Sequence, residues 1–426
     1  MRRTTTIIAT GLLGAVLLVP ATGSTAAAVP TCQGEAATLV GTKETLVGTK
    51  GRDVIVTGKA FQVKARGGDD LICVVPRRTG INVLYIEAGS GDDVVDTTSA
   101  TLNGYYVDTH LGGGSDTLEG GRGGDWVETG DATGDTSEVD VVRTGAGDDR
   151  VTTSGGADVV DLGPGNDDLT LDGPGTSAGG TLEGGDGYDT FTKPVGASGE
   201  HAFDLAAGTF RSPTGAADFP SFESLTVEAG GAAVAITGTE GDDYVTVTSD
   251  GTEPSTVVAD LGDGDDDLLL DGSRLGAASR IDLGSGADRL VAARRSGHLA
   301  LDLTSGTLEI GRTTFSAGGV EDAFAMARRV EITGDAQDNS LSAFACRAAI
   351  VGRGGDDELI WQGDYIFESY SFGCRPSAVL RGGAGDDSFY GSRGDDRILG
   401  GAGDDLARGG AGRDRCVAER KQACER

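Results

Sequence analysis

The most regular alternation of apolar and polar positions lies in residues 382–417, where the pattern repeats every nine residues. Four units follow one another, GGAGDDSFY, GSRGDDRIL, GGAGDDLAR and GGAGRDRCV. In each unit the eighth residue is uncharged, the sixth is Asp, and the first and fourth are Gly. Nine residues make about 2.5 turns of an α-helix, and this much glycine disfavours a helix. The pattern instead predicts short strands joined by tight turns and stacked rung upon rung.

The apolar eighth positions of these units are Phe389, Ile398, Ala407 and Cys416, which we expect to face the core. Glycine permits positive φ angles and lets backbone carbonyls come close to an ion. Ca²⁺ takes six to eight oxygen ligands, which carboxylates and exposed carbonyls supply. With two units per rung, turns eighteen residues apart should lie about 4.8 Å from each other. We therefore expect ions between Asp387 and Asp405 on one edge, and between Asp396 and Asp414 on the other.

This stretch resembles the RTX, or haemolysin-type calcium-binding, nonapeptide G-G-x-G-x-D-x-(apolar)-x. In that family the first six residues form a calcium-binding turn and the last three a short strand, so the resemblance implies a parallel β-roll with Ca²⁺ as its cofactor. Carried over position by position, it implies metal-binding roles for Gly382, Gly385, Asp387, Gly391, Gly394, Asp396, Gly400, Gly403, Asp405, Gly409, Gly412 and Asp414. Degenerate units add Asp149, Asp158 and Asp167.

Degenerate units occur throughout the rest of the chain. They begin at residues 48, 65, 88, 111, 120, 144, 153 and 162, and single copies begin at residues 184, 238, 261, 283, 334 and 352. The segments between turns are β-branched or alternating, as in Tyr244–Thr248. Helix signals are confined to Glu321–Arg329 and the tail from Arg415. We predict an all-β fold, an elongated right-handed parallel β-solenoid, or β-roll, built from degenerate RTX nonapeptides and capped by disulfides.

A longer period appears in the middle of the chain. Phe203-Asp204-Leu205 recurs 98 residues later as Leu301-Asp302-Leu303, and Glu223-Ser224 recurs as Glu321-Asp322 at the same offset. This repeat predicts a duplicated block of strands. The expected organisation is a signal peptide at 1–28, a degenerate solenoid at 29–180, block copies at 181–280 and 281–375, and a regular β-roll with a disulfide cap at 376–426.

The first 28 residues have the composition of a secretory signal peptide. Arg2 and Arg3 precede the apolar run Ile7–Val19, and Ala26-Ala27-Ala28 offers a cleavage site after Ala28. The run is too short for a membrane span, and no later stretch is long enough. We expect a secreted, extracellular protein.

Six cysteines, Cys32, Cys73, Cys346, Cys374, Cys416 and Cys424, fit three disulfides in an oxidising compartment. Six cysteines allow fifteen pairings, of which proximity along the chain favours 32–73, 346–374 and 416–424. None has the spacing of a zinc site. We expect the last pair to close the C-terminal end of the coil.

The net charge of the chain limits the classes of molecule that it can bind. The formal net charge is −32, and loss of Arg2 and Arg3 with the signal peptide makes it −34. This surplus disfavours nucleic acid and anionic membranes, and favours cations. The three histidines, His110, His201 and His298, share no metal-ligand spacing, and we expect each in a loop or at the surface rather than as a catalytic base.

Three kinds of function fit these patterns. The first, which we favour, is a calcium-binding extracellular monomer with no enzymatic activity, structural or adhesive in role, with cell-surface or matrix components as partners. The second is a secreted polysaccharide-acting β-helix enzyme with its site along a strand face. The third is a structural solenoid that needs no calcium.

Overall fold

The computed structural model describes residues 29–425 except 76–82, 101–105, 131–137, 154–155, 173–179, 197–198, 214, 250–252, 273, 295, 364, 367–369 and 375. The expected signal peptide and its cleavage site lie outside these residues. Every regular element within them is a β-strand. Neither of the two candidate helix segments is helical: residues 321–329 contain strand β32 (Asp322–Met326), and the tail from Arg415 forms two further strands. No described helix is long and apolar enough to cross a membrane.

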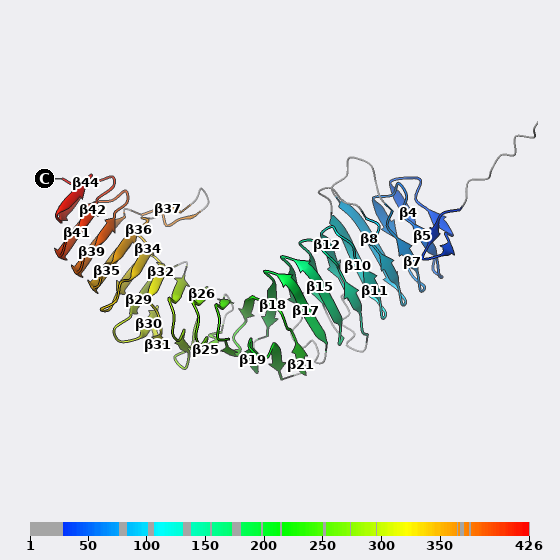
Figure 1. The fold of residues 1–426 in the computed structure, drawn as a ribbon, viewed down its shortest axis with the longest axis horizontal. Coiled ribbons are helices and arrows are strands. Elements are labelled where there is room, and N and C mark those ends of the chain that lie inside the picture. The colour runs from blue at the N-terminus through cyan, green and yellow to red at the C-terminus, as the bar shows by residue number, and fades with distance from the viewer. Residues whose placement is uncertain are drawn as a thin grey trace, which may run out of the picture.

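The strands form two long sheets that pack face to face in a curved solenoid (Figure 1). The predicted all-β fold with mainly parallel strand pairing is thus confirmed. The sheet on the concave side contains, in spatial order, β4 (Thr45–Val47), β6 (Gln62–Lys64), β8 (Val83–Ser90), β10 (Tyr106–Gly113), β12 (Asp125–Glu128), β14 (Arg150–Thr153), β16 (Asp168–Leu171), β18 (Thr190–Val195), β22 (Ser224–Ala229), β24 (Tyr244–Thr248), β26 (Asp267–Asp271), β28 (Arg289–Ala293), β32 (Asp322–Met326), β34 (Ser340–Phe344), β36 (Glu358–Trp361), β40 (Ser388–Tyr390), β42 (Leu406–Arg408) and β44 (Arg420–Gln422).

The sheet on the convex side contains β3 (Leu39–Val40), β5 (Val54–Val56), β7 (Leu71–Cys73), β9 (Val94–Asp96), β11 (Thr117–Glu119), β13 (Val141–Arg143), β15 (Val159–Gly165), β17 (Thr181–Gly187), β21 (Gly215–Asp218), β20 (Thr209–Ser212), β19 (Glu200–Asp204), β23 (Ala233–Thr237), β25 (Thr256–Asp260), β27 (Arg280–Asp282), β31 (Thr313–Gly318), β30 (Thr307–Ile310), β29 (His298–Asp302), β33 (Arg329–Thr333), β35 (Arg347–Gly354), β39 (Ser377–Ala384), β41 (Arg397–Ala402) and β43 (Arg415–Val417). Two short hairpins, β1 (Thr31–Cys32) with β2 (Glu35–Ala36) and β37 (Tyr365–Ile366) with β38 (Tyr370–Ser371), lie outside both sheets.

The strands form because their residues alternate between core and solvent. In β26 the two leucines, Leu268 and Leu270, are buried, whereas the aspartates at its ends are partly exposed. Stacked rungs turn this alternation into one continuous core of Val, Leu, Ile, Phe and Ala along the described chain. The inward positions expected in the C-terminal rungs are confirmed, since Phe389, Ile398 and Ala407 are all fully buried.

The convex sheet makes two antiparallel detours that the concave sheet lacks. Strands β19–β20–β21 form the first detour and β29–β30–β31 the second, and β30 starts at Thr307, 98 residues after Thr209 starts β20. Leu205 and Leu303 follow the equivalent strands β19 and β29, and both pack against the core. The same element order therefore recurs at the offset seen in the sequence. The block boundaries at 181–280 and 281–375 stay a prediction.

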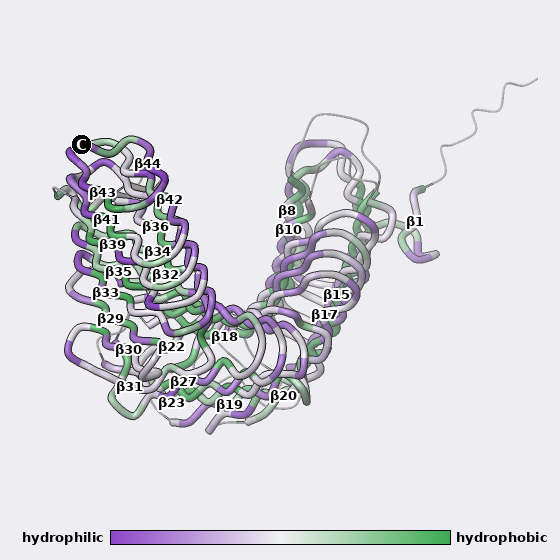
Figure 2. The backbone as a smooth tube through the Cα atoms, turned by 60° about the vertical axis from the view of Figure 1, so that its left-hand side comes forward, coloured by the Kyte–Doolittle hydropathy of each residue, from purple (hydrophilic) through white to green (hydrophobic). Residues whose placement is uncertain are grey.

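These detours give a physical reason for the curvature. Within the described residues the convex sheet has 22 strands and the concave sheet 18. Four additional strands at about 4.8 Å each make one face roughly 19 Å longer than the other. The solenoid must then bend with the longer sheet outside, and Figure 2 shows two arms that meet where the detour strands lie.

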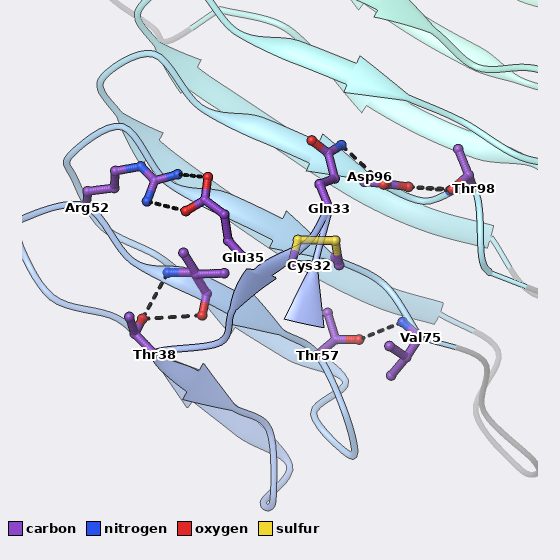
Figure 3. Close-up of a disulfide and its surroundings, with 11 residues drawn as sticks. Cys32, Gln33, Glu35, Thr38, Arg52, Thr57, Val75, Asp96 and Thr98 are labelled. Carbon is purple, nitrogen blue, oxygen red and sulfur yellow. Dashed lines mark hydrogen bonds and ion pairs between the residues drawn. A yellow bond between two sulfur atoms is a disulfide. The ribbon is translucent and has the colours of Figure 1, made fainter. Parts of the chain in front are cut away.

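Three disulfides are present, Cys32–Cys73, Cys346–Cys374 and Cys416–Cys424. This is the pairing that proximity along the chain favoured. The first ties the hairpin β1–β2 to β7 (Figure 3). Beneath this hairpin, Val54, Val56 and Leu71 on the outer face of the convex sheet are buried. The hairpin is held further by the ion pair between Arg52 and Glu35 at 2.9 Å. The last disulfide ties the terminal turn to β43.

Candidate cation-binding turns

Glycine-rich turns line both edges of the solenoid. On the edge that we call edge one, turns lead from a convex strand to a concave strand, and on edge two they lead back. Asp387 and Asp405 directly precede β40 and β42 on edge one, whereas Asp396 and Asp414 precede β41 and β43 on edge two. Because Gly383 pairs with Gly401, the turns stack in an eighteen-residue register. The expected partners therefore lie on neighbouring rungs.

Each turn aspartate contacts the next along its edge. The backbone N–H of Asp387 donates to Oδ1 of Asp405 at 3.1 Å, and that of Asp396 donates to Oδ1 of Asp414 at 2.9 Å. The same bond joins Asp149 to Asp167 at 2.7 Å on edge one. Asp158 lies on edge two, where it accepts from Asp140. Asp149, Asp158, Asp167, Asp387 and Asp405 are thus members of longer carboxylate ladders, whereas Asp396 and Asp414 form a pair of their own on edge two.

These ladders form four long columns, which we number for reference. On edge one, column 1 is Asp125, Asp149, Asp167, Asp189 and Glu223; column 2 is Asp243, Asp266, Asp288 and Glu321; column 3 is Asn339, Asp357, Asp387, Asp405 and Glu419. On edge two, column 4 is Asp53, Asp70, Asp93, Asp116, Asp140 and Asp158.

The glycines are required where one turn rests on another. Gly403 has φ +149°, and a Cβ there would overlap the carbonyl oxygen of Gly385 on the preceding rung. At the first position of the same turn, a Cβ on Gly400 would overlap Oδ2 of Asp405. A backbone carbonyl and a carboxylate oxygen therefore lie so close to the turn that only glycine fits at these two positions.

The second carboxylate oxygen is what the fold leaves unsatisfied. Oδ2 is buried without a hydrogen-bond partner in eleven turn aspartates among the described residues: Asp70, Asp93, Asp116, Asp149, Asp167, Asp189, Asp266, Asp288, Asp357, Asp387 and Asp405. An unpaired buried carboxylate oxygen is costly unless a cation or a proton meets it. A hard oxygen donor beside closely packed carbonyls has the chemistry that Ca²⁺ prefers.

Burial also changes the acidity of these groups. Desolvation raises the pKa of Asp387 to about 6 and that of Asp167 to about 7, partly offset by the backbone N–H that each accepts. The pKa of Asp116 rises to about 8, again chiefly because burial disfavours its charged form. Neighbouring carboxylates in each column add to the rise. Without a cation, burial thus makes the charged form of these three carboxylates less favourable than that of an exposed aspartate.

A second kind of turn needs no such partner. In the turn ending at Asp243, the backbone N–H of Thr239 donates to Oδ2 at 2.7 Å, and Thr49 does the same for Asp53 at 2.7 Å. Ser392 donates likewise to Oδ2 of Asp396 at 3.2 Å. Each of these turns has Thr or Ser at its second position, where the regular unit has Gly. We call them closed turns, and those with an unpaired Oδ2 open turns.

Three glutamates occupy the ladder position without belonging to a nonapeptide. Oε2 of Glu223, Glu321 and Glu419 accepts the backbone N–H of Asp189, Asp288 and Asp405 at 2.7, 3.0 and 3.1 Å. The sequence interpretation missed their role. The recurrence of Glu223-Ser224 as Glu321-Asp322 was a signal for two of them, because each glutamate directly precedes a concave strand, as the ladder aspartates do.

Acidic side chains alone do not complete a site. No three His, Cys, Asp or Glu side chains gather as a metal-binding group in the described part of the chain. An ion held by two neighbouring turns would therefore need backbone carbonyls as well as carboxylates. The carbonyl oxygen of Gly385 lies close to Gly403 on the next rung, beside the stacked turns.

The histidines are dispersed, as their spacing predicted, but the surface expectation is wrong for His201. His201 is buried, and its ring stacks on Phe210 with centroids 6.1 Å apart. His110 lies on the exposed face of β10, between Asp108 and Glu128. Hydrophobic packing between the two sheets at the first detour accounts for the burial of His201.

Comparison with known families supports the interpretation of the turns. A family model for four copies of the RTX calcium-binding nonapeptide repeat matches residues 110–132, 136–169 and 379–416. The chain therefore contains these repeats. No curated protein matches the sequence. Column 2 lies wholly outside the matched residues, although its aspartates make the same ladder contacts.

Proposed function

We propose that this is a secreted calcium-binding repeat protein in which ions between stacked turns are coupled to folding. The observation that carries the proposal is the set of eleven buried, unpaired Asp Oδ2 atoms, all in turns of the nonapeptide type. A calcium ion would coordinate these oxygens, because Ca²⁺ prefers oxygen ligands such as carboxylates and backbone carbonyls. The RTX repeats in the chain support the same cation.

Coupling to folding follows from charge and from the thin core of the C-terminal rungs. Two unit charges one rung spacing apart, about 4.8 Å, repel by about 3 kcal/mol at an effective dielectric of about 20. Glycine-rich turns also lose much conformational entropy on ordering. Inward residues such as Phe389, Ile398 and Ala407 provide one side chain per strand to offset these costs. Calcium that bridges Asp387 and Asp405 removes the repulsion and joins two rungs, so binding free energy becomes folding free energy.

We assign the whole chain a structural or adhesive role outside the cell, as a monomer, rather than an enzymatic one. The three disulfides fit an oxidising, extracellular compartment. Extracellular calcium modules work with dissociation constants on the order of 10⁻⁴–10⁻³ M, because calcium there is abundant. A rigid, curved scaffold that needs calcium would hold its shape only after export.

The test is a calcium titration of the purified protein, followed by calorimetry and by hydrogen exchange with and without a chelator. We expect the C-terminal rungs to gain protection with calcium but not with magnesium, which sheds its bound waters reluctantly. The buried Trp361 on β36 provides a fluorescence signal for the same region.

A matched pair of variants separates ligand loss from charge loss. Asp387→Asn with Asp405→Asn removes two buried carboxylates and should abolish the calcium-induced protection of β40–β42. Asp386→Asn with Asp404→Asn removes two exposed carboxylates from the same turns and should leave it nearly unchanged. Equal responses of the two double variants, or no calcium response of the wild type, would refute the proposal.

A further inference from the structure

The four columns have defined beginnings. The first member of each has its side-chain oxygen satisfied without a cation. Asp53 and Asp243 belong to closed turns, Oδ1 of Asn339 accepts from the backbone N–H of Asp335 at 3.2 Å, and Oδ2 of Asp125 accepts from the hydroxyl of Thr97 at 3.2 Å. All eleven unpaired Oδ2 atoms occur after these first members. A column therefore starts with a turn that needs no ion.

The closed turn is chemically distinct from an open one. In the turn of Asp243, the Thr239 hydroxyl donates to the carbonyl of Gly241 at 3.0 Å, while the Thr239 N–H satisfies Oδ2. Thr49 makes the equivalent hydroxyl bond to Gly51 at 2.9 Å. Two oxygens that an ion would need are thus already hydrogen-bonded. A Thr at the second position replaces the cation with hydrogen bonds.

The columns on edge one also have defined ends. Where β21 leads to β22, β31 to β32 and β43 to β44, the chain has no turn of the nonapeptide type, and a glutamate extends to the last aspartate instead. These last aspartates, Asp189, Asp288 and Asp405, are fully buried with Oδ2 unpaired. The same arrangement occurs three times at corresponding places of the fold. Each glutamate brings a second carboxylate next to an unsatisfied buried oxygen.

We propose that calcium binds in bounded columns, in which each open turn holds one ion and Glu223, Glu321 and Glu419 supply the terminal carboxylate ligands. Closed turns hold none. The inference rests on the proposed calcium function and deepens it. It adds sites outside the matched repeats, among them those at Asp266 and Asp288 of column 2. It also assigns the C-terminal ions to edge one, because Asp396 on edge two belongs to a closed turn.

Neighbouring turns of column 2 provide the first test. Bound calcium per chain is measured by equilibrium dialysis of the whole protein at saturating calcium. Asp266→Asn, in an open turn, should lose one ion relative to the wild type, whereas Asp243→Asn, in the closed turn one rung before, should lose none. Both aspartates are buried, so the two variants are matched in environment and charge. Loss of an ion in both variants, or in neither, would overturn the assignment of open and closed turns.

The second test addresses the glutamates. Glu223→Gln, Glu321→Gln and Glu419→Gln together keep the acceptor oxygen and remove three carboxylates, and should lower the bound calcium by about one ion per glutamate. The control replaces Glu183, Glu228 and Glu358, which lie on strands, by Gln and should bind as much calcium as the wild type. Full stoichiometry in the first variant would overturn the role of the glutamates while leaving calcium binding intact. A wild type that binds no calcium would instead overturn the proposed function, and this inference with it.

Discussion

Replacement of Gly403 by Ala tests whether the turns stack as described. Gly403 is the fourth residue of its turn, has φ +149°, and lies against the carbonyl oxygen of Gly385. Alanine in this backbone region costs about 1–3 kcal/mol in strain. Its Cβ would also push the turn off the preceding rung and break the bond from the Asp387 N–H to Asp405, which is worth about 1.5–3 kcal/mol with a charged acceptor. The local cost is therefore roughly 2.5–6 kcal/mol.

Gly51 is the matched control. It is also the fourth residue of its turn, but a Cβ there would have no heavy atom within 4 Å, and its φ lies outside the positive region. Gly51→Ala should change stability by less than about 0.5 kcal/mol, or raise it slightly, because alanine restricts the unfolded chain. Hydrogen exchange in saturating calcium should show lost protection in β41 and β42 for Gly403→Ala only. If the two variants exchange alike, the stacking argument is wrong.

Three further predictions concern the C-terminal rungs and the columns. Burial raises the pKa of Asp387 to about 6 and that of Asp396 to about 7, compared with about 3.9 in the unfolded chain, so the calcium-free fold binds protons that the unfolded chain releases. The melting temperature of the calcium-free protein should therefore rise as the pH falls from 8 to 5. A melting temperature that decreases over this range in thermal scans would contradict the argument. Phe389→Ala, at a fully buried position, should cost about 3–5 kcal/mol in urea unfolding and weaken calcium binding with it; unchanged affinity would separate binding from folding. Non-reducing peptide mapping should find Cys416 linked to Cys424, and Cys416→Ser with Cys424→Ser should cost at most a few kcal/mol; a free thiol in the wild type would remove this clasp.

Much of the fold followed from the sequence because its determinants are local. The nine-residue period fixes where a strand ends and a turn begins, so the burial of Phe389 and Ile398 and the stacking of Asp387 on Asp405 were predictable. The curvature was not predictable, since it depends on antiparallel detours whose strands look like any other alternating segment. The helix signal at residues 321–329 was misleading for a related reason. Residues 321–329 contain good helix formers, but Asp322–Met326 pair with strands on both sides.

The ligand set was only partly predictable, because a motif describes one turn and a column depends on its neighbours. Asp396 and Asp387 occupy the same position of neighbouring units. The backbone N–H of Ser392 donates to Oδ2 of Asp396, whereas Oδ2 of Asp387 has no hydrogen-bond partner. The difference lies at the second position of the unit, where Ser392 replaces the Gly of the motif. Glu419 has no motif at all and is recognised only because β44 places it beside Asp405.

The bend and the breaks in the columns have the same structural origin. An uninterrupted column needs one glycine turn per rung on its edge, whereas a detour replaces that turn with a return from an antiparallel strand. At β21 and β31 the chain re-enters the concave sheet in this way, and there Glu223 and Glu321 end columns 1 and 2. A longer side chain is needed because the backbone no longer follows the turn path, and Glu has one methylene more than Asp. The two detours therefore interrupt the carboxylate ladder on edge one and separate columns 1, 2 and 3 from one another.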